Sequence, residues 1–274
     1  MSVDLAGRYQ RLRDLLAGMG GLVVGLSGGV DSVVLAKVAH DVLGDRALAV
    51  TADSPSLPRR ELREAVEVAE QIGVAHLVAP TAELDNPEYA ANPGNRCYFC
   101  RSELFEVLDR IAAERGLGWI AYGENVSDAG DHRPGAIAAA ERSVRAPLKE
   151  AGLGKDDIRA LAAHLGLPTW DKPAFACLAS RLPQGTPVTP ERLAQVEAAE
   201  DLLRPLGLRQ YRVRHHGDIA RIEVPPEDMA TVLEHAPRLV AAIRDLGFPH
   251  VTLDLAGYRR GSLSQPLIVG IGRP

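Results

Sequence analysis

The sequence has few cysteines, few aromatic residues and no excess of positive charge, and each shortage excludes a class of protein. Three cysteines in 274 residues are too few for a disulfide framework, which favours a reducing, cytoplasmic setting. Aromatic residues make up 4% of the chain, too few for the stacking platforms of single-strand nucleic-acid binders. The net charge of -5 argues against a broadly basic surface, so we expect no nucleic-acid partner.

Long apolar runs are also missing. None approaches the ~20 residues that a membrane-spanning helix needs. The charged residues of segment 1–16 leave no apolar core for a secretory signal, so we expect neither a membrane partner nor secretion. The composition, 46% hydrophobic and 24% charged, is that of an ordinary globular protein that buries a core without disulfides.

The first two thirds of the chain alternate short apolar runs with amphipathic helical patterns. Strands are expected at 22–26, 46–52, 75–80 and 118–122, and helices at 3–18, 31–43, 58–72 and 98–115. This alternation predicts an α/β fold with a doubly wound parallel sheet over residues 1–180. Such sheets bind ligands at the carboxyl ends of their strands, so the loops there are the places to look for chemistry.

The pattern changes after a loop-rich stretch at 178–190. The last part of the chain is expected to hold a helix at 190–204, strands at 209–215 and 218–224, a helix at 226–246 and a strand at 249–255. These elements predict a second, smaller α+β domain over 188–274.

The most informative turn is a glycine-rich segment between the first expected strand and the helix that follows it. It consists of Ser27, Gly28, Gly29, Val30, Asp31 and Ser32. Glycines let backbone amides approach a phosphate, and the helix N-terminus adds N–H donors and partial positive charge. The spacing matches neither a Walker A loop nor a dinucleotide turn. Asp31 would suit a phosphate bridged by Mg²⁺, and an ordinary tight turn with a helix-start charge is the alternative.

The Ser-Gly-Gly-Val-Asp-Ser turn resembles the PP-loop of ATP pyrophosphatases, which have an adenine nucleotide alpha hydrolase-like fold. Segments 51–54 and 123–128, at the ends of the second and fourth strands, agree with that family. The resemblance implies cleavage of ATP between its α and β phosphates and transfer of AMP to a substrate oxygen. It assigns further ATP contacts to Asp53, Ser54, Gly123, Asn125 and Lys155, and Mg²⁺ to Asp31 and Asp128. A solvated first-turn lysine is the alternative for Lys155.

Two cysteines, Cys97 and Cys100, lie one helical turn apart between Arg96 and Arg101. Positive neighbours favour thiolates, which bind soft metals. Cys177 is the third cysteine, and three thiolate ligands would leave one position of a zinc or iron–sulfur site open. Buried or incidental thiols and a thioredoxin-like redox pair are the alternatives.

The stretches around the cysteines resemble a narrower family, the ATP-dependent sulfur transferases of nickel-pincer nucleotide cofactor synthesis (the LarE family). Three segments carry this resemblance, which extends over nearly the whole chain: 92–100, 173–183 and 257–263. It implies that a pyridinium-3,5-dicarboxylate mononucleotide is adenylated on a carboxylate and that sulfur then replaces AMP to give a thiocarboxylate. The chain is similar to the form in which Cys97, Cys100 and Cys177 hold a [4Fe-4S] cluster with a transferable sulfide. These cysteines and Asp31 are the catalytic candidates, and sacrifice of the Cys177 sulfur is the alternative.

Arg212 and Arg214 stand two apart on an expected strand, so they share one face and suit a phosphate. The LarE resemblance assigns them to the phosphate of the small nucleotide substrate, with Ser180, Arg181 and Glu200 as further contacts. A solvated basic strand is the alternative. The resemblance also implies a homo-oligomer. A tRNA thiolase, a non-catalytic ATP-binding iron–sulfur sensor and an amide-forming ligase are the other functions that stay open.

Overall fold

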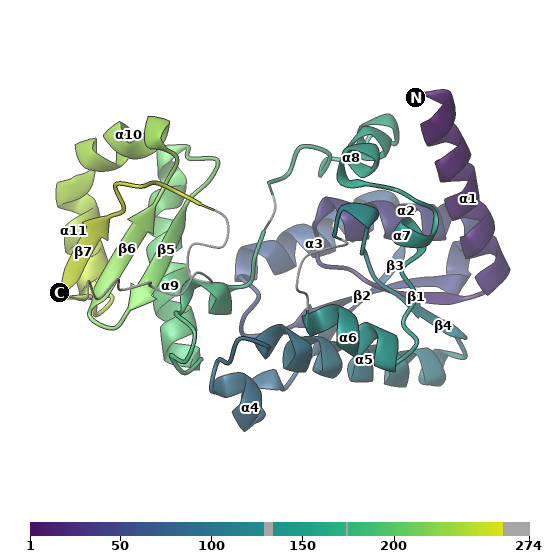
Figure 1. Ribbon diagram of the computed structural model, residues 1–274, viewed down its shortest axis with the longest axis horizontal. Helices are drawn as coiled ribbons and strands as arrows, with labels where there is room; N and C mark the ends of the chain where they lie inside the picture. The colour runs from purple at the N-terminus through teal and green to yellow at the C-terminus, as the bar shows by residue number, and fades with distance from the viewer. Residues whose placement is uncertain (129–133, 174, 260–274) are drawn as a thin grey trace, which may run out of the picture. The chain divides into compact units, whose positions relative to one another are not determined.

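The computed structural model describes residues 1–128, 134–173 and 175–259, which form two compact units (Figure 1). The first unit contains Met1–Asn86 and Asn95–Phe175, and the second contains Pro87–Gly94 and the chain from Ala176 onward. Of the segments noted above, residues 174 and 260–263 lie outside the described residues. Within the described ranges, no helix has the length and apolar character needed to span a lipid bilayer.

The first unit is built on a four-stranded parallel sheet. Its strands are β1 (Leu22–Gly25), β2 (Ala47–Asp53), β3 (Ala75–Pro80) and β4 (Trp119–Ala121), in the order β3-β2-β1-β4. Every neighbouring pair is parallel. The strand order reverses at β1, and such a switch point is where a doubly wound sheet binds its ligand. The predicted α/β fold class is confirmed.

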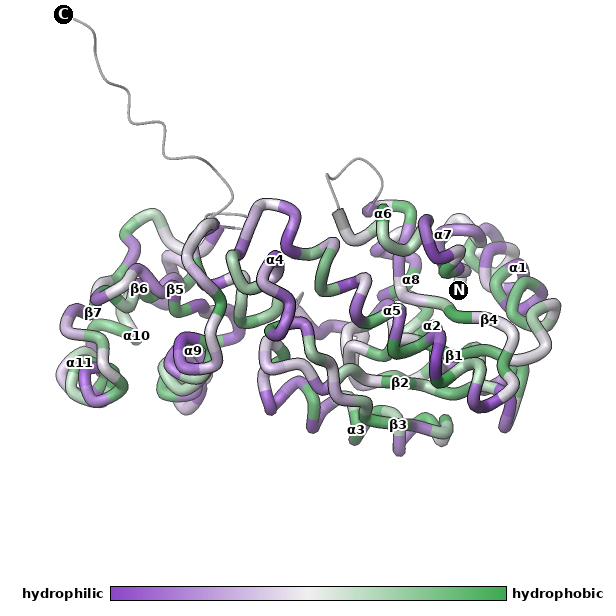
Figure 2. Tube along the Cα trace, turned by 90° about the horizontal axis from the view of Figure 1, so that it is seen from below, coloured by the Kyte–Doolittle hydropathy of each residue, from purple (hydrophilic) through white to green (hydrophobic). Residues whose placement is uncertain are grey.

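Helices cover both faces of this sheet. One hydrophobic cluster joins it to α1 (Val3–Met19), α2 (Val30–Leu43), α3 (Arg59–Ile72), α7 (Pro147–Glu150) and α8 (Lys155–His164), and a second joins it to α5 (Arg96–Arg115) and α6 (Pro134–Glu141). Neighbouring residues of β1 alternate between them, since Val24 belongs to the first cluster and Val23 to the second. Because both faces are covered, β1 and β2 are apolar stretches, as Figure 2 shows.

The second unit contains a three-stranded sheet with helices on one face. Its elements are α4 (Pro87–Ala90), α9 (Pro190–Leu203), β5 (Arg212–His216), β6 (Ile219–Glu223), α10 (Met229–Glu234), α11 (Ala236–Asp245) and β7 (His250–Leu253). Strand β6 pairs antiparallel with β5 and parallel with β7. Val213 and Ile222 are buried in one cluster with residues of α9 and α11. Because side chains alternate along a strand, Arg214 and Glu223 belong to the other face.

The short segment 87–94 lies with the second unit, although the chain continues from it into the first. The side-chain amide of Asn92 donates to the carbonyl oxygens of Pro183 and Thr186, at 2.8 and 2.9 Å. The predicted division at 180–188 assigns 87–94 and 176–180 to the first domain. The two units therefore divide the chain differently from the prediction at these two segments. Hydrogen bonds between residues so far apart in the sequence leave no periodic pattern from which this division could be predicted.

The continuous helix expected at 226–246 is wrong. The chain forms a 3-10 turn at Pro226–Asp228 and then two helices, α10 and α11, that meet at His235. Pro237 is the second residue of α11 and has no N–H to donate, so a single helix cannot run through it. The other expected helices and strands are all present, and α4, α6, α7 and α8 are additional.

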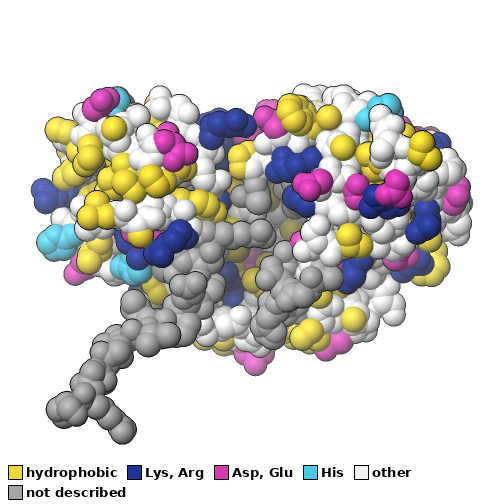
Figure 3. Space-filling model, turned by 45° about the horizontal axis from the view of Figure 1, so that its top comes forward, with side chains coloured by type: hydrophobic (Ala, Val, Ile, Leu, Met, Phe, Trp, Pro, Cys, Tyr) yellow, Lys and Arg dark blue, Asp and Glu magenta, His cyan; other side chains and the backbone are white. Residues whose placement is uncertain are grey.

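One face of the second unit is markedly apolar. Figure 3 shows hydrophobic side chains gathered there. In the described part of this unit, the exposed large hydrophobic side chains are Ile219, Leu233 and Leu255. An apolar surface of this kind is typical of an interface with another protein.

Candidate functional site

The glycine-rich turn joins β1 to α2 at the switch point of the sheet. Gly28 has a φ of +72°, in the left-handed region that favours glycine, and the extended residue Gly29 is the N-cap of α2. A Cβ on Gly28 would lie 3.3 Å from the Cβ of Ala65 in α3, so the turn packs closely on that helix. The first N–H groups of a helix have no partner within it, so this turn offers several donors to an anion.

Hydrogen bonds of Ser27 and Ser32 stabilise the turn. The Ser32 hydroxyl donates to the Gly29 carbonyl at 3.0 Å and accepts from the Ser27 backbone N–H at 3.1 Å. The two hydroxyl oxygens are 3.1 Å apart. Ser32 is buried and Ser27 is exposed, so Ser27 has the hydroxyl that a ligand can reach.

Asp31, in the first turn of α2, pairs with Lys155, the first residue of α8. Lys155 Nζ lies 2.6 Å from Asp31 Oδ2. The other oxygen, Asp31 Oδ1, is buried and has no hydrogen-bond partner among the described residues. Burial raises the pKa of Asp31, the bond to Lys155 opposes the rise, and the charge of Asp128 adds to it. A buried carboxylate oxygen with no donor, close to a second carboxylate, is chemically suited to Mg²⁺.

The loop after β4 connects the glycine-rich turn to α8. A Cβ on Gly123 would lie 2.8 Å from the backbone nitrogen of Ser32, so only glycine fits there without a shift. Asn125 is buried, and its Oδ1 accepts from the Ser127 N–H at 2.9 Å. The Ser127 hydroxyl in turn accepts from the Lys155 N–H at 3.0 Å. The structure therefore brings Gly123, Asn125 and Lys155 to the turn, while their ATP contacts stay predictions.

Asp53 and Ser54, at the end of β2, are held by polar contacts within the unit. Arg59, the first residue of α3, donates to the Asp53 carboxylate and, at 2.6 Å, to the Ser54 carbonyl. The Ser54 hydroxyl donates to the Glu83 carboxylate. These contacts fix the loop that the resemblance assigns to ATP.

Arg59 and Lys172 are not among the site residues predicted from the sequence. The Lys172 ammonium lies 3.1 Å from the Gly28 carbonyl oxygen, directly at the glycine-rich turn. Lys172 immediately precedes one of the segments that resemble the LarE family, which is the one signal that singles it out. No spacing rule connects residue 172 with residue 28.

Cys97 and Cys100 lie in the first turn of α5 and are three residues apart, so their side chains share one side of the helix. Cys97 is exposed, Cys100 is half-buried, and neither is in a disulfide. Cys177 is also free of a disulfide and belongs to the second unit. In the described chain, no three His, Cys, Asp or Glu side chains are grouped as a metal centre requires. The cluster therefore stays a prediction.

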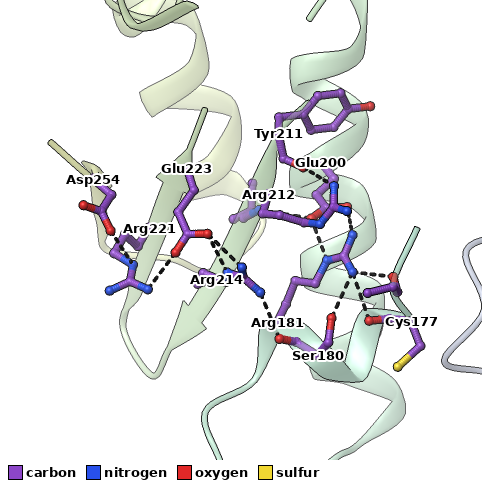
Figure 4. Close-up of polar contacts among 12 residues, drawn as sticks. Cys177, Ser180, Arg181, Glu200, Tyr211, Arg212, Arg214, Arg221, Glu223 and Asp254 are labelled. Carbon is purple, nitrogen blue, oxygen red and sulfur yellow. Dashed lines mark hydrogen bonds and ion pairs between the residues drawn. The ribbon is translucent and has the colours of Figure 1, made fainter. Parts of the chain in front are cut away.

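Cys177 precedes the short 3-10 turn Leu178–Arg181, which a buried arginine holds in place. Arg181 Nη1 donates to the Cys177 carbonyl at 3.0 Å and to the Ser180 hydroxyl at 3.1 Å (Figure 4). Its Nε and Nη2 donate to the two Glu200 oxygens at 2.8 and 3.0 Å. Arg181 is 0% exposed, so this paired arginine fixes the backbone at Cys177 relative to α9.

Arg214 lies beside this turn on β5. Its Nε and Nη2 pair with Glu223 Oε2 at 2.9 and 2.8 Å, and its Nη1 donates to the Ser180 carbonyl at 3.0 Å. Glu223 is fully buried and also accepts from Arg221 at 2.8 Å. Two arginines therefore share one buried carboxylate (Figure 4).

Arg212 lies on the same face of β5 as Arg214. It donates to the Tyr211 carbonyl at 2.6 Å, and its guanidinium carbon is 5.5 Å from the centre of the Tyr258 ring. Burial lowers the pKa of Arg212, and the charge of Arg181 lowers it further. Arg212 and Arg214 are only 8% and 6% exposed, so the alternative of a solvated basic strand is wrong. The phosphate contact itself stays a prediction.

Known proteins resemble this chain over different lengths. The family model for NAD synthase matches residues 10–88, which include the glycine-rich turn. An uncharacterized protein of Synechocystis is 45% identical over 96% of this chain and 99% of its own length. The pyridinium-3,5-bisthiocarboxylic acid mononucleotide synthase of Lactiplantibacillus plantarum is 39% identical over 90% of each chain. The tRNA-specific 2-thiouridylase MnmA of Azorhizobium caulinodans is 31% identical over 56% of this chain and 48% of its own.

Proposed function

Because the chain belongs to the family of pyridinium-3,5-bisthiocarboxylic acid mononucleotide synthases, we propose the following reaction for it. The enzyme, an ATP-using sulfur transferase, adenylates a carboxylate of a pyridinium-3,5-dicarboxylate mononucleotide and then replaces AMP with sulfur. The observation that carries this proposal is the PP-loop at the sheet's switch point, with the half-buried Asp31 and its unpartnered Oδ1 at the start of α2.

The first step is binding of ATP at the glycine-rich turn. Its phosphates would accept hydrogen bonds from the N–H groups of Gly29 and Val30 and from the Ser27 hydroxyl. Asp31 and Asp128 would hold Mg²⁺, which neutralises charge on the departing pyrophosphate. The unpartnered Asp31 Oδ1 supports this assignment, because a metal ion supplies what the described side chains do not.

Lys155 would exchange partners when ATP binds. With Mg²⁺ at Asp31, the Lys155 ammonium is released from the carboxylate that it contacts in the free protein. A phosphate oxygen is the natural new partner for a compact ammonium. The exchange leaves no cation unpaired and supports the ATP role of this lysine.

Adenylation makes the carboxylate reactive. A carboxylate oxygen attacks the α-phosphorus of ATP, the bond to the β-phosphate oxygen breaks, and pyrophosphate leaves. The carbonyl carbon then carries AMP as a leaving group, and a sulfur nucleophile displaces it to form a C–S bond. Without this activation, the leaving group would be an oxide ion, which departs far less readily than AMP.

The second unit would bind the phosphate of the mononucleotide. Arg212 and Arg214 are buried cations on one face of β5, and Arg181 adds to the positive charge there. A phosphate would offset the unfavourable burial of Arg212 and accept paired hydrogen bonds. Ser180 would add a hydroxyl donor, while Glu200, already bonded to Arg181, would act by holding that arginine.

The sulfur would come from a [4Fe-4S] cluster held by Cys97, Cys100 and Cys177. Two observations support these ligands: Cys97 and Cys100 lie on one helical turn, and all three cysteines are free of disulfides. When bound, such a cluster supplies a transferable sulfide at its open iron. The chain's own part is to present the three thiol groups as ligands.

The alternative source of sulfur is Cys177 itself. In that case its thiolate attacks the adenylated carbonyl and AMP leaves. Loss of the Cα proton and breakage of the Cβ–S bond then release the thiocarboxylate and leave dehydroalanine. The chain would emerge lighter by the mass of H₂S after one turnover.

Iron analysis and mass spectrometry of the same anaerobic preparation separate the two sources. The cluster predicts about four irons and at least four acid-labile sulfides per chain, with a further sulfide in the loaded form. It also predicts loss of iron in Cys97→Ser and an unchanged chain mass after turnover. A preparation that lacks iron after reconstitution and loses H₂S from Cys177 would overturn the cluster. The proposed reaction itself fails if the mononucleotide is not thiolated with either source, and tRNA supplied as an alternative acceptor tests the thiolase function.

A homo-oligomer is proposed as the assembled form. The exposed Leu233 and Leu255 of the second unit support it, since an isolated chain would leave these large apolar side chains in water. Light scattering coupled to gel filtration measures the mass of the assembly. Leu233→Glu should lower that mass, and an unchanged mass would exclude the surface around Leu233 as the interface.

A further inference from the structure

Lys172 contacts three separate acceptors in the first unit. Its Nζ is 2.8 Å from Glu61 Oε2, 2.8 Å from Glu64 Oε2 and 3.1 Å from the Gly28 carbonyl oxygen. An ammonium group has three N–H donors, so these acceptors can use all of them. The Lys172 side chain is 16% exposed and that of Glu61 is 2% exposed, so the contact with Glu61 is an almost dry ion pair.

The contact with Gly28 fixes the peptide bond between Gly28 and Gly29. In a trans peptide the carbonyl and the following N–H point in opposite directions. Lys172 holds the Gly28 carbonyl and thereby directs the Gly29 N–H away from itself. Glycines on both sides of this peptide offer little resistance to rotation of its plane, so an external group has to select the orientation.

Helix α8 keeps Lys172 in place. Arg159 donates from its two terminal nitrogens to the carbonyls of Trp170 and Lys172, each at 2.8 Å. The Lys172 N–H donates to the Thr169 carbonyl at 3.1 Å. Arg159 is one turn along α8 from Lys155, so the helix that pairs with Asp31 also anchors the segment that carries Lys172.

We propose that Lys172 is a positioning residue for ATP. It holds the Gly28–Gly29 peptide so that the Gly29 N–H is directed at the phosphates, and Glu61 on α3 anchors the ammonium. Lys172 acts through the peptide and does not itself touch the nucleotide. This inference rests on the proposed function, because it requires the glycine-rich turn to bind ATP.

A purely structural role for Lys172 makes a different prediction. Glu61 is a buried carboxylate that also pairs with Arg60 at 3.0 Å, and Lys172 would then serve only to neutralise it. In that case, removing the charge of Glu61 along with that of Lys172 repairs the site. If Lys172 orients the peptide, the double change repairs nothing, because the Gly28 carbonyl still lacks its donor.

The test is calorimetric titration of the full-length protein with Mg²⁺ and the non-hydrolysable analogue α,β-methylene ATP. We expect Lys172→Met to weaken binding by about ten-fold or more, the effect of losing a charge-assisted hydrogen bond. Lys172→Met combined with Glu61→Gln should stay equally weak, and Lys172→Arg should recover most of the affinity. Lys37→Met, which removes a lysine paired with Asp41 elsewhere on α2, is the matched control and should bind like the parent.

Several results would overturn the inference. It fails if Lys172→Met binds the analogue as tightly as the parent, or if the double variant regains the parent's affinity. Binding of AMP, which lacks the β and γ phosphates, should change by less than about two-fold in Lys172→Met; an equal loss for AMP would indicate a loosened unit and would also overturn it. If the parent protein binds no ATP analogue, the proposed function is wrong as well. If the parent binds the analogue and thiolates the mononucleotide, and Lys172→Met binds the analogue equally well, only the role of Lys172 is refuted.

Discussion

Lys155 Nζ and Asp31 Oδ2 lie 2.6 Å apart although the two residues are 124 positions apart in the sequence. Their ion pair joins the first residue of α8 to the first turn of α2, beside the glycine-rich turn. It uses one oxygen of the carboxylate and leaves Oδ1 buried without a partner among the described residues. The free enzyme therefore holds together the two charges that ATP with Mg²⁺ would separate.

The first prediction concerns the cost of partly burying the Asp31 carboxylate. Burial raises the pKa of Asp31, so its ionised form is less favourable in the folded than in the unfolded chain. Stability is therefore lost as the pH rises from the ordinary aspartate pKa through the raised one. Asp31→Asn should melt at a higher temperature than the parent at pH 7, and the difference should shrink toward pH 4. It should also lower ATP-dependent thiolation by about 100-fold or more.

Asp41→Asn is the matched control for that measurement. Asp41 pairs with Lys37 at 2.6 Å on the same helix, where both side chains are about a quarter exposed. This change should leave thiolation intact and should not raise the melting temperature at pH 7. If Asp31→Asn melts below the parent at pH 7, the carboxylate stabilises the free protein and the assigned pKa direction is wrong.

The second prediction concerns the Lys155 side chain. Lys155→Met removes the cation that opposes the rise in the pKa of Asp31, so that pKa should rise further. If Asp31 binds Mg²⁺ as proposed, it must be ionised to do so, and the acid limb of kcat/KM for ATP should move to higher pH. The KM for ATP should also increase, by about ten-fold. A larger KM with an unchanged acid limb would mean that Lys155 contacts phosphate but does not lower the pKa of Asp31.

The parallel sheet and the glycine-rich turn could be predicted from the sequence because both depend on local patterns. Strands buried on both faces are apolar runs such as 22–26, and the helices between them have their own periodicity. The turn is a contiguous motif, so its glycines and Asp31 are visible without any tertiary information. The break in the helix at 226–246 was also visible in principle, since Pro237 stands inside the expected helix.

The supporting contacts of the site could not be predicted in the same way. Lys172 meets Gly28 across 144 positions, and the buried partner of Arg214 is Glu223, on the neighbouring strand. Charged residues are usually exposed, so the burial of Arg214 cannot be predicted from the sequence alone. It becomes understandable only when the register of β5 and β6 places Glu223 near it. The register also decides which face of the sheet carries charge.

The third prediction uses two glycines that flank β4. A Cβ at position 123 would lie 2.8 Å from the Ser32 nitrogen, whereas one at position 118 would meet nothing within 4 Å. Gly123→Ala should push the loop off α2, lowering the free energy of unfolding by about 1–3 kcal/mol and weakening ATP binding. Gly118→Ala should leave both unchanged. Denaturant unfolding and calorimetry measure the two effects, and equal behaviour of the two variants would show that the loop accommodates the methyl group.

The fourth prediction concerns the buried carboxylate that Arg214 and Arg221 share. Glu223 is 0% exposed, so Glu223→Ala leaves the cations without their common partner and should lower the free energy of unfolding by about 3–5 kcal/mol. Glu234→Ala, an exposed position on α10 of the same unit, should change it by less than about 0.5 kcal/mol.

Inorganic phosphate gives that experiment a second readout. If Arg212 and Arg214 bind the substrate phosphate, an added anion should replace part of the lost negative charge. Phosphate should then raise the melting temperature of Glu223→Ala more than that of the parent, while chloride at equal ionic strength should not. Equal responses of the two proteins would mean that the arginines are closed to anions, and the substrate phosphate would have to bind elsewhere.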